Sequence, residues 1–165
     1  MIQSILQFVN MILAASQKAP LFKATDQNGN EVRLSQFRGN RVILFFYPKS
    51  DTPACTTQSC NLRDHFEELQ KEGFVIIGVS PDLQAQQSRF GHKYQLPFIL
   101  VSDSEKKIIS QYGVWGEKQL YGKKYEGLIR TTFLIDEKGI IRHVIHRPKN
   151  KDHAQQIKEA WNGLN

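Results

Sequence analysis

The chain has 165 residues, of which 40% are hydrophobic and 23% are charged, a composition typical of one soluble globular domain. Its 22 lysines and arginines outnumber its 16 aspartates and glutamates. This net charge of +6 is spread along the chain, with only a mild concentration over residues 142–151, and therefore argues against nucleic acid as a partner. Two cysteines are too few for a disulfide scaffold, so nothing in the composition indicates an oxidising compartment, and we expect a cytoplasmic location.

Residues 1–16 form a mostly apolar N-terminal stretch. A secretory signal requires basic residues ahead of its apolar run, whereas the first basic residue here is Lys18. The run is also interrupted by polar residues and is too short to cross a bilayer. We therefore interpret residues 1–12 as an N-terminal extension and residues 13–165 as the domain. Export or membrane association through residues 1–16 is the alternative.

The first predicted elements are a hairpin and a buried strand. Asn28-Gly29 is a strong turn signal, and residues 31–34 suit a short strand after it. Residues 41–47 are rich in β-branched and aromatic side chains without polar alternation, which predicts a central strand covered on both faces. Pro48 ends this strand.

The segment after this strand holds both cysteines. Thr52 followed by Pro53 predicts a helix start, because a threonine hydroxyl can accept a hydrogen bond from the first turn and proline suits the first helical position. Cys55 is then the third helical residue. A thiol in this turn lies near unpaired N–H groups and the positive end of the helix dipole, which favours its thiolate. Cys55 is therefore placed like a reactive cysteine.

Cys60 lies five residues after Cys55. On a helix, five residues correspond to a rise of roughly 7.5 Å and a rotation of about 140°, so the two sulfurs point away from each other. A disulfide needs the Cα atoms within about 7 Å and can form only if the first turns of the helix unwind. The spacing favours a disulfide that is made and broken during a reaction over a permanent one. From the residues alone, two ordinary buried cysteines remain the alternative.

The rest of the chain alternates between helices and strands. Apolar residues at helical spacing extend the cysteine-bearing helix to Gly73, where it ends. A polar stretch with glycines and lysines over residues 116–127 predicts a surface insertion. This order of elements predicts an α/β domain. We expect strands over residues 74–79, 98–101, 128–135 and 140–145, and helices over residues 80–94, 104–112 and 151–161.

Several motifs carry a resemblance to a known family. Pro48-x-x-x-Thr52-x-x-Cys55 resembles the active-site signature of the peroxiredoxins, and a second cysteine five residues on resembles their bacterioferritin comigratory protein subfamily, also called peroxiredoxin Q. The resemblance implies a thioredoxin-like fold with the peroxiredoxin insertions, in which helices flank a central mixed β-sheet. It covers roughly residue 13 to the C-terminus and continues in order through residues 78–82, 100–103, 112–118 and 130–136.

The resemblance also implies roles for individual residues. Cys55 would be the peroxidatic cysteine, whose thiolate attacks a peroxide and becomes a sulfenic acid, and Cys60 would resolve it as an intramolecular disulfide. Arg130 would stabilise the thiolate, Thr52 would direct its hydroxyl at the thiolate or the peroxide, and Pro48 would shield the thiolate from water. Without the resemblance, Thr52 is interpreted as a plain helix cap and Arg130 as a surface residue.

The implied activity is a thiol-dependent peroxidase in antioxidant defence. It would reduce hydrogen peroxide and organic hydroperoxides to water and alcohols, and thioredoxin or a similar dithiol would recycle it. Members of the subfamily are often monomers, so a monomer without stable membrane association is expected. A non-catalytic thiol redox sensor is the alternative function. No nucleotide fingerprint is present and His143, His146 and the two cysteines lack the usual spacing of zinc ligands, so neither a cofactor nor a metal is expected.

Two residues depart from the pattern of the subfamily. Ala54 occupies a position where glycine is frequent, and Asn61 follows the second cysteine where a small residue is frequent. Neither change removes a reacting group. Since alanine favours a helix over glycine by about 1 kcal/mol, Ala54 is expected to slow the unwinding that a disulfide requires and to prolong exposure of the sulfenic acid to overoxidation.

Overall fold

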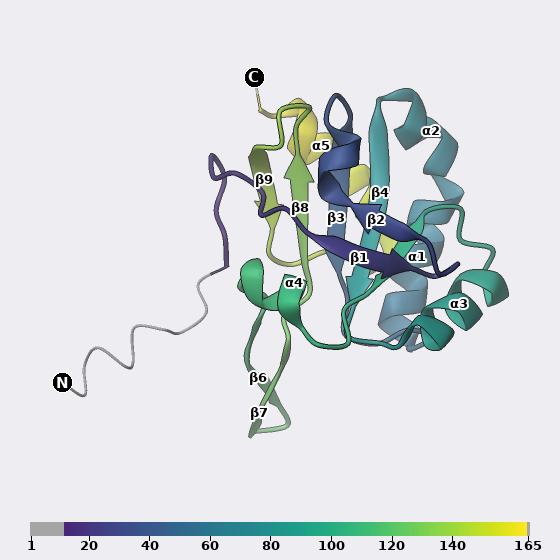
Figure 1. Cartoon of the computed structure of the whole chain (residues 1–165). Helices are drawn as coiled ribbons and strands as arrows, with labels where there is room; N and C mark the ends of the chain where they lie inside the picture. The colour runs from purple at the N-terminus through teal and green to yellow at the C-terminus, as the bar shows by residue number, and fades with distance from the viewer. Residues whose placement is uncertain (1–11, 165) are drawn as a thin grey trace.

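A seven-stranded mixed sheet forms the centre of the molecule (Figure 1). The computed structural model describes residues 12–164, so residues 1–11 of the predicted extension lie outside the described residues. The order is β2-β1-β5-β4-β3-β8-β9, in which β3 runs parallel to β4 and β4 to β5, and the other pairs are antiparallel. The strands are β1 (Lys23–Asp26), β2 (Glu31–Arg33), β3 (Arg41–Phe46), β4 (Phe74–Ser80), β5 (Ile99–Ser102), β8 (Thr131–Ile135) and β9 (Ile141–Ile145).

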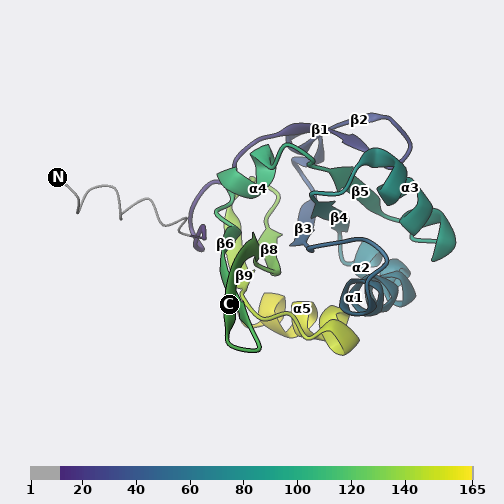
Figure 2. The same cartoon turned by 90° about the horizontal axis from the view of Figure 1, so that it is seen from below.

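Helices cover both faces of this sheet (Figure 2). One face packs against α1 (Pro53–Asp64), α2 (Phe66–Lys71), α3 (Gln84–Lys93) and α5 (His153–Asn162). The other packs against α4 (Lys107–Gln111) and the 3-10 turn η3 (Leu34–Phe37), and a second such turn, η4 (Asn150–Asp152), precedes α5. The predicted α/β class with a central mixed sheet flanked by helices is confirmed. Within residues 12–164, none of the helices is both long and apolar enough to span a bilayer.

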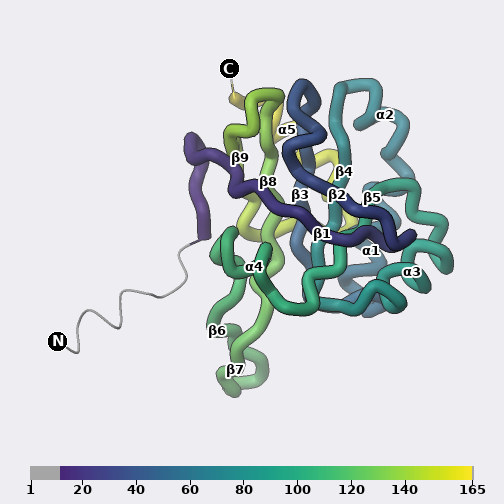
Figure 3. The backbone as a smooth tube through the Cα atoms, viewed as in Figure 1, coloured from purple at the N-terminus to yellow at the C-terminus, as the bar shows by residue number. Residues whose placement is uncertain are grey.

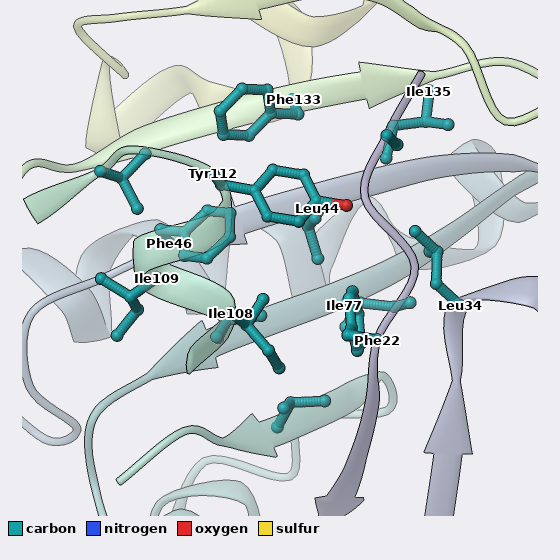
Figure 4. Close-up of a cluster of buried hydrophobic side chains, with 14 of the residues drawn as sticks. Phe22, Leu34, Leu44, Phe46, Ile77, Ile108, Ile109, Tyr112, Phe133 and Ile135 are labelled. Atoms are coloured by element: carbon teal, nitrogen blue, oxygen red, sulfur yellow. The ribbon is translucent and has the colours of Figure 1, made fainter. Parts of the chain in front are cut away.

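Strand β3 divides the hydrophobic core in two. Successive side chains of a strand point to opposite faces, and every residue from 42 to 47 is at most 2% exposed. The even-numbered residues join the cluster of Figure 4, where Phe46 lies with Tyr112 and Phe133. The odd-numbered residues pack under the helices of the other face. As predicted, β3 is buried on both faces. This packing holds in place the end of β3 from which the cysteine segment continues.

The helix predicted to run to Gly73 is broken at His65, where α1 ends and α2 begins. The ring nitrogen Nδ1 of His65 lies 2.9 Å from the carbonyl oxygen of Asn61, and the backbone N–H of His65 donates to Arg63 instead. Since a carbonyl only accepts, the ring donates in place of the N–H that would continue the helix. The periodicity of apolar residues continues across the break and does not reveal it.

The predicted insertion over residues 116–127 is a β-hairpin that extends beyond the main sheet (Figure 3). The single strand predicted over residues 128–135 is therefore wrong, because Leu128 ends the hairpin and the strand of the main sheet begins at Thr131. Arg130 lies between the two. The strands of the hairpin are β6 (Trp115–Leu120) and β7 (Lys123–Leu128).

Three predicted helices begin later than expected, at Gln84, Lys107 and His153. Ahead of the first two, aspartate side chains bind neighbouring groups and hold the chain in a turn. Asp82 accepts a hydrogen bond of 2.7 Å from the hydroxyl of Ser80, and Asp103 accepts one of 3.0 Å from the N–H of Lys107. Ahead of the third, the chain first forms the short turn η4.

Candidate active site

Cys55 lies in the first turn of α1, which starts just beyond the buried end of β3. Thr52 is the N-cap in an extended conformation and Pro53 is the first helical residue, as predicted. The predicted capping bond is absent, because the hydroxyl of Thr52 donates to the carbonyl of Lys49 at 2.7 Å and accepts nothing from the first turn. The N–H groups of that turn therefore have no bond from a Thr52 side-chain cap.

The loop that leads into α1 is held by polar side chains from the turn between β4 and α3 and from the C-terminal end of α3. The N–H and the hydroxyl of Ser50 both donate to Asp82 at 2.7 Å. Asp51 has a left-handed backbone, with φ of 59°, and its carboxylate accepts from Lys93 at 2.9 Å and from the Tyr94 hydroxyl at 2.7 Å. These contacts fix the position of the first turn of α1 relative to the sheet.

Arg130 brings its guanidinium to the sulfur of Cys55. Nη2 of Arg130 donates to Sγ of Cys55 at 3.2 Å, and Nη1 donates to Oε1 of Gln58 at 2.6 Å. Cys55 is 1% exposed and Gln58 is fully buried. A guanidinium that faces a sulfur with so little water around it stabilises negative charge there.

Two residues of this site, Gln58 and Lys118, were not predicted from the sequence. Gln58 follows Cys55 by three residues and so lies on the same helix face. This spacing is the sequence signal that could have placed Gln58 near the thiol. Lys118 comes from the hairpin. Burial first, and then the charge of Arg130, hold the pKa of Lys118 below its ordinary value, while Cys55 acts in the opposite direction. Lys118 thus shares the electrostatic environment of the thiol.

Cys60 is a half-buried free thiol in the middle of α1, and Cys55 is also free. Because α1 is continuous across both residues, helix geometry separates their Cα atoms by about 8–9 Å. Burial raises the pKa of the Cys60 thiol. In this conformation the cysteines are too far apart for a disulfide, as the spacing predicted, and a bridge requires α1 to unwind.

The remaining candidates lie around this centre or apart from it. Pro48 is half-buried between β3 and the loop. His143 lies on β9 and His146 just beyond it, and nowhere within residues 12–164 do three potential metal-ligating side chains gather. An apolar groove runs beside the first turn of α1 and is lined by Pro53, Ala54 and Thr57 together with residues 149–152.

A buried histidine, His153, connects β8 to α5. His153 is fully buried, with Nδ1 3.0 Å from Oε1 of Gln156 and Nε2 2.9 Å from the hydroxyl of Thr132. An amide oxygen only accepts, so Nδ1 carries the proton and Nε2 accepts from the hydroxyl. Burial, with a smaller contribution from the charge of Arg130, lowers the pKa of His153 to about 4.

The fold and this site together define a class of protein. A thiol in the first turn of a helix, with an arginine guanidinium beside its sulfur, is the arrangement of an enzyme that uses a thiolate as its nucleophile. Comparisons with known proteins identify the family within this class.

The model of the AhpC/TSA family matches residues 15–144. Peroxiredoxin Bcp of Escherichia coli (strain K12) is 46% identical over 145 residues, which cover 88% of this chain and 93% of that protein. Peroxiredoxin Bcp of Bacillus subtilis (strain 168) is 41% identical over 146 residues, with coverages of 88% and 93%. A structure of the bacterioferritin comigratory protein of Xanthomonas campestris, described for its alkyl peroxide reduction activity, has a TM-score of 0.82 at 26% identity and covers 94% of this chain and 99% of that one.

This chain belongs to the AhpC/TSA family. Within the family it is a peroxiredoxin of the Bcp and peroxiredoxin Q type, a peroxidase that acts on peroxides with a thiol reductant. The predicted family, the thioredoxin-like fold and the peroxidase activity are thereby confirmed. The roles of the individual site residues remain predictions.

Proposed function

We propose that Cys55 is the peroxidatic cysteine, that Cys60 resolves its sulfenic acid, and that thioredoxin or a similar dithiol reduces the resulting disulfide. The observation that carries the proposal is the 3.2 Å hydrogen bond from Arg130 to the Cys55 sulfur. It provides a permanent cation, which cannot lose its proton near neutral pH, at the atom that must bear negative charge.

In the first step, the Cys55 thiolate attacks one oxygen of the peroxide and the O–O bond breaks. The sulfur is oxidised to a sulfenic acid and the other oxygen leaves as water or an alcohol after taking up a proton. Arg130 stabilises the charge that passes from sulfur to the leaving oxygen. The Thr52 hydroxyl turns from the carbonyl of Lys49 toward the peroxide, and Pro48 limits the access of water.

In the second step, α1 unwinds and the Cys60 sulfur attacks the sulfenic sulfur of Cys55. An S–S bond forms, the S–O bond breaks and water leaves. A dithiol then reduces the disulfide by exchange, and its own two thiols become a disulfide. The burial that raises the pKa of Cys60 in the folded helix is relieved in the unwound state, which favours attack there.

We propose hydrogen peroxide and organic hydroperoxides as substrates. The apolar groove beside Pro53 and Ala54 adjoins the helix turn of Cys55 and suits the alkyl part of an organic hydroperoxide. The alkyl peroxide reduction activity described for the Xanthomonas campestris relative supports the same class.

We propose further that the protein acts as a cytoplasmic monomer, without a nucleic acid or membrane partner. A catalytic cycle that returns both cysteines to thiols requires a reducing compartment. Light scattering of the reduced protein measures the oligomeric state. Mass spectrometry of the natural protein measures its N-terminus, and a start after Ala15 would contradict a cytoplasmic location.

Consumption of NADPH in the presence of peroxide, thioredoxin and thioredoxin reductase tests the proposal. We expect sustained turnover for the parent protein and none for Cys55→Ser. Cys60→Ser should consume one equivalent of peroxide and stop as sulfenic acid, which a dimedone adduct on Cys55 detects. Full thioredoxin-linked turnover of Cys60→Ser would remove Cys60 from its assigned role, and a single stoichiometric turnover of the parent would indicate a redox sensor.

A further inference from the structure

Asn61, the residue after Cys60, attaches α1 to the start of α5. Its Nδ2 donates to the carbonyl of Lys151 at 3.0 Å, and its Oδ1 accepts from the backbone N–H of Ala154 at 2.8 Å. Both partners are backbone groups far away in the chain, at separations of 90 and 93 residues. Figure 2 shows α1 and α5 side by side on the same face of the sheet. We call these two bonds the Asn61 clamp.

The Asn61 clamp satisfies a group that α5 cannot satisfy itself. The N–H of Ala154 lies in the first turn of α5, where backbone donors have no partner within the helix. The N-cap residue of α5, Asp152, makes no capping bond with its side chain. Ala154 is fully buried, so its N–H loses its bond without ready replacement by water if Asn61 moves away. The clamp therefore favours the folded form of α1 around Cys60.

A second anchor follows Asn61 by two residues. Nη1 of Arg63, also on α1, donates to the carbonyl of Tyr94 at 2.8 Å. The turn that carries Cys60 is thus attached to α5 by Asn61 and to the end of α3 by Arg63. Unwinding that moves Cys60 toward Cys55 pulls against both attachments.

We propose that Asn61 is a positioning residue that slows resolution by holding Cys60 in the folded helix. The inference rests on the proposed roles of Cys55 and Cys60. While the clamp holds, the sulfenic acid of Cys55 persists and can meet a second peroxide. In that competing step the sulfur gains a further oxygen and becomes a sulfinic acid, the O–O bond breaks and water or alcohol leaves. Asn61 thereby sets how much peroxide the protein tolerates before it is inactivated.

The substitution Asn61→Ala tests the clamp, because it removes both bonds but strengthens the helix. Alanine is a better helix former than asparagine, so helix propensity alone predicts slower unwinding. Loss of the clamp predicts faster unwinding instead. We expect the first-order rate of disulfide formation to rise about tenfold, equivalent to about 1.4 kcal/mol. The second-order rate of the first peroxide step should stay unchanged.

Rapid-quench alkylation with mass spectrometry separates the sulfenic, disulfide and sulfinic forms over time. The dose of peroxide that converts half of the protein to sulfinic acid should rise about tenfold in Asn61→Ala, in proportion to the faster resolution. Asn61→Asp keeps an acceptor for the N–H of Ala154 but replaces the donor to Lys151 with a carboxylate oxygen that repels this carbonyl, so it should form the disulfide faster than the parent. Glu67→Ala, on the exposed surface of α2, should behave like the parent.

The possible failures are distinguishable. If the parent forms a Cys55–Cys60 disulfide at the same rate as Asn61→Ala, or faster, the clamp does not govern resolution and the inference is wrong. If the parent forms no such disulfide, the proposed role of Cys60 fails and the inference fails with it. Thermal unfolding of each reduced variant measures its stability. A purely structural role of Asn61 would change that stability but leave the partition between disulfide and sulfinic acid unchanged.

Discussion

The guanidinium of Arg130 lies 3.2 Å from the sulfur of Cys55, although 75 residues separate them in the chain. The pairing of β3 with β8 explains this contact. Phe46, at the end of β3, lies opposite Thr131, at the start of β8, so Arg130 precedes β8 at the same end of the sheet at which the cysteine segment follows β3. The register of two strands thus places the cation at the thiol.

Arg130→Met should lower the second-order rate constant for hydrogen peroxide by about 10²-fold, because loss of one fixed donor to a developing charge typically has that effect. Arg130→Lys should recover part of the loss, since a lysine keeps the charge but cannot bind Cys55 and Gln58 through one planar fork. Stopped-flow measurement of peroxide consumption gives the rates. Arg142→Met is the control, because Arg142 is exposed on β9. A rate for Arg130→Met equal to that of the control would contradict the prediction.

Gln58→Leu should lower the same rate constant about tenfold, because the hydrogen bond that orients Arg130 is worth about 1.5 kcal/mol when the donor is charged. The effect should disappear in the background of Arg130→Met, since Gln58 acts only through the guanidinium. A double-mutant cycle measures this coupling. Additive losses would show that Gln58 acts independently of Arg130. Gln70→Leu, on the exposed face of α2, serves as the control.

Ala54→Gly should speed disulfide formation and make the protein more resistant to overoxidation. Ala54 is exposed in the first turn of α1, where a glycine weakens the helix by about 1 kcal/mol without removing a contact of the core. A roughly fivefold rise in the peroxide dose that produces sulfinic acid is therefore expected. Dose-dependent mass spectrometry of the oxidised protein measures it, and equal sensitivity of variant and parent would refute it.

His153 should make the stability of the reduced protein depend on pH. Its folded-state pKa of about 4 is below the ordinary 6.5, so the unfolded chain binds more protons between these values and stability is lost as the pH falls. From pH 7 to pH 5, we expect a loss of about 2 kcal/mol in the free energy of unfolding. Urea unfolding measures this loss.

His153→Gln should lose less stability than the parent over the same pH range, whatever its absolute stability. His146→Gln replaces an exposed histidine and should follow the parent. Parallel curves for the parent and His153→Gln would show that another group causes the dependence.

Local patterns in the sequence sufficed for most of the sheet and for the start of α1. The apolar run of β3, the Asn28-Gly29 turn and the Thr52-Pro53 helix start depend on neighbouring residues, and all three are present in the structure. The break at His65 and the hairpin that contains Lys118 were not predicted. In both cases a side-chain contact or a strand pairing outweighed local propensity.

The sequence by itself determined that Cys55 enters a helix in its first turn and that Cys60 follows on the same helix, because both depend on spacing along one short segment. Only the tertiary structure decided which groups surround them. Arg130 reaches Cys55 through strand register, and Asn61 reaches the start of α5 through helix packing. Contacts across such distances in the chain leave no periodic signal in the residues themselves.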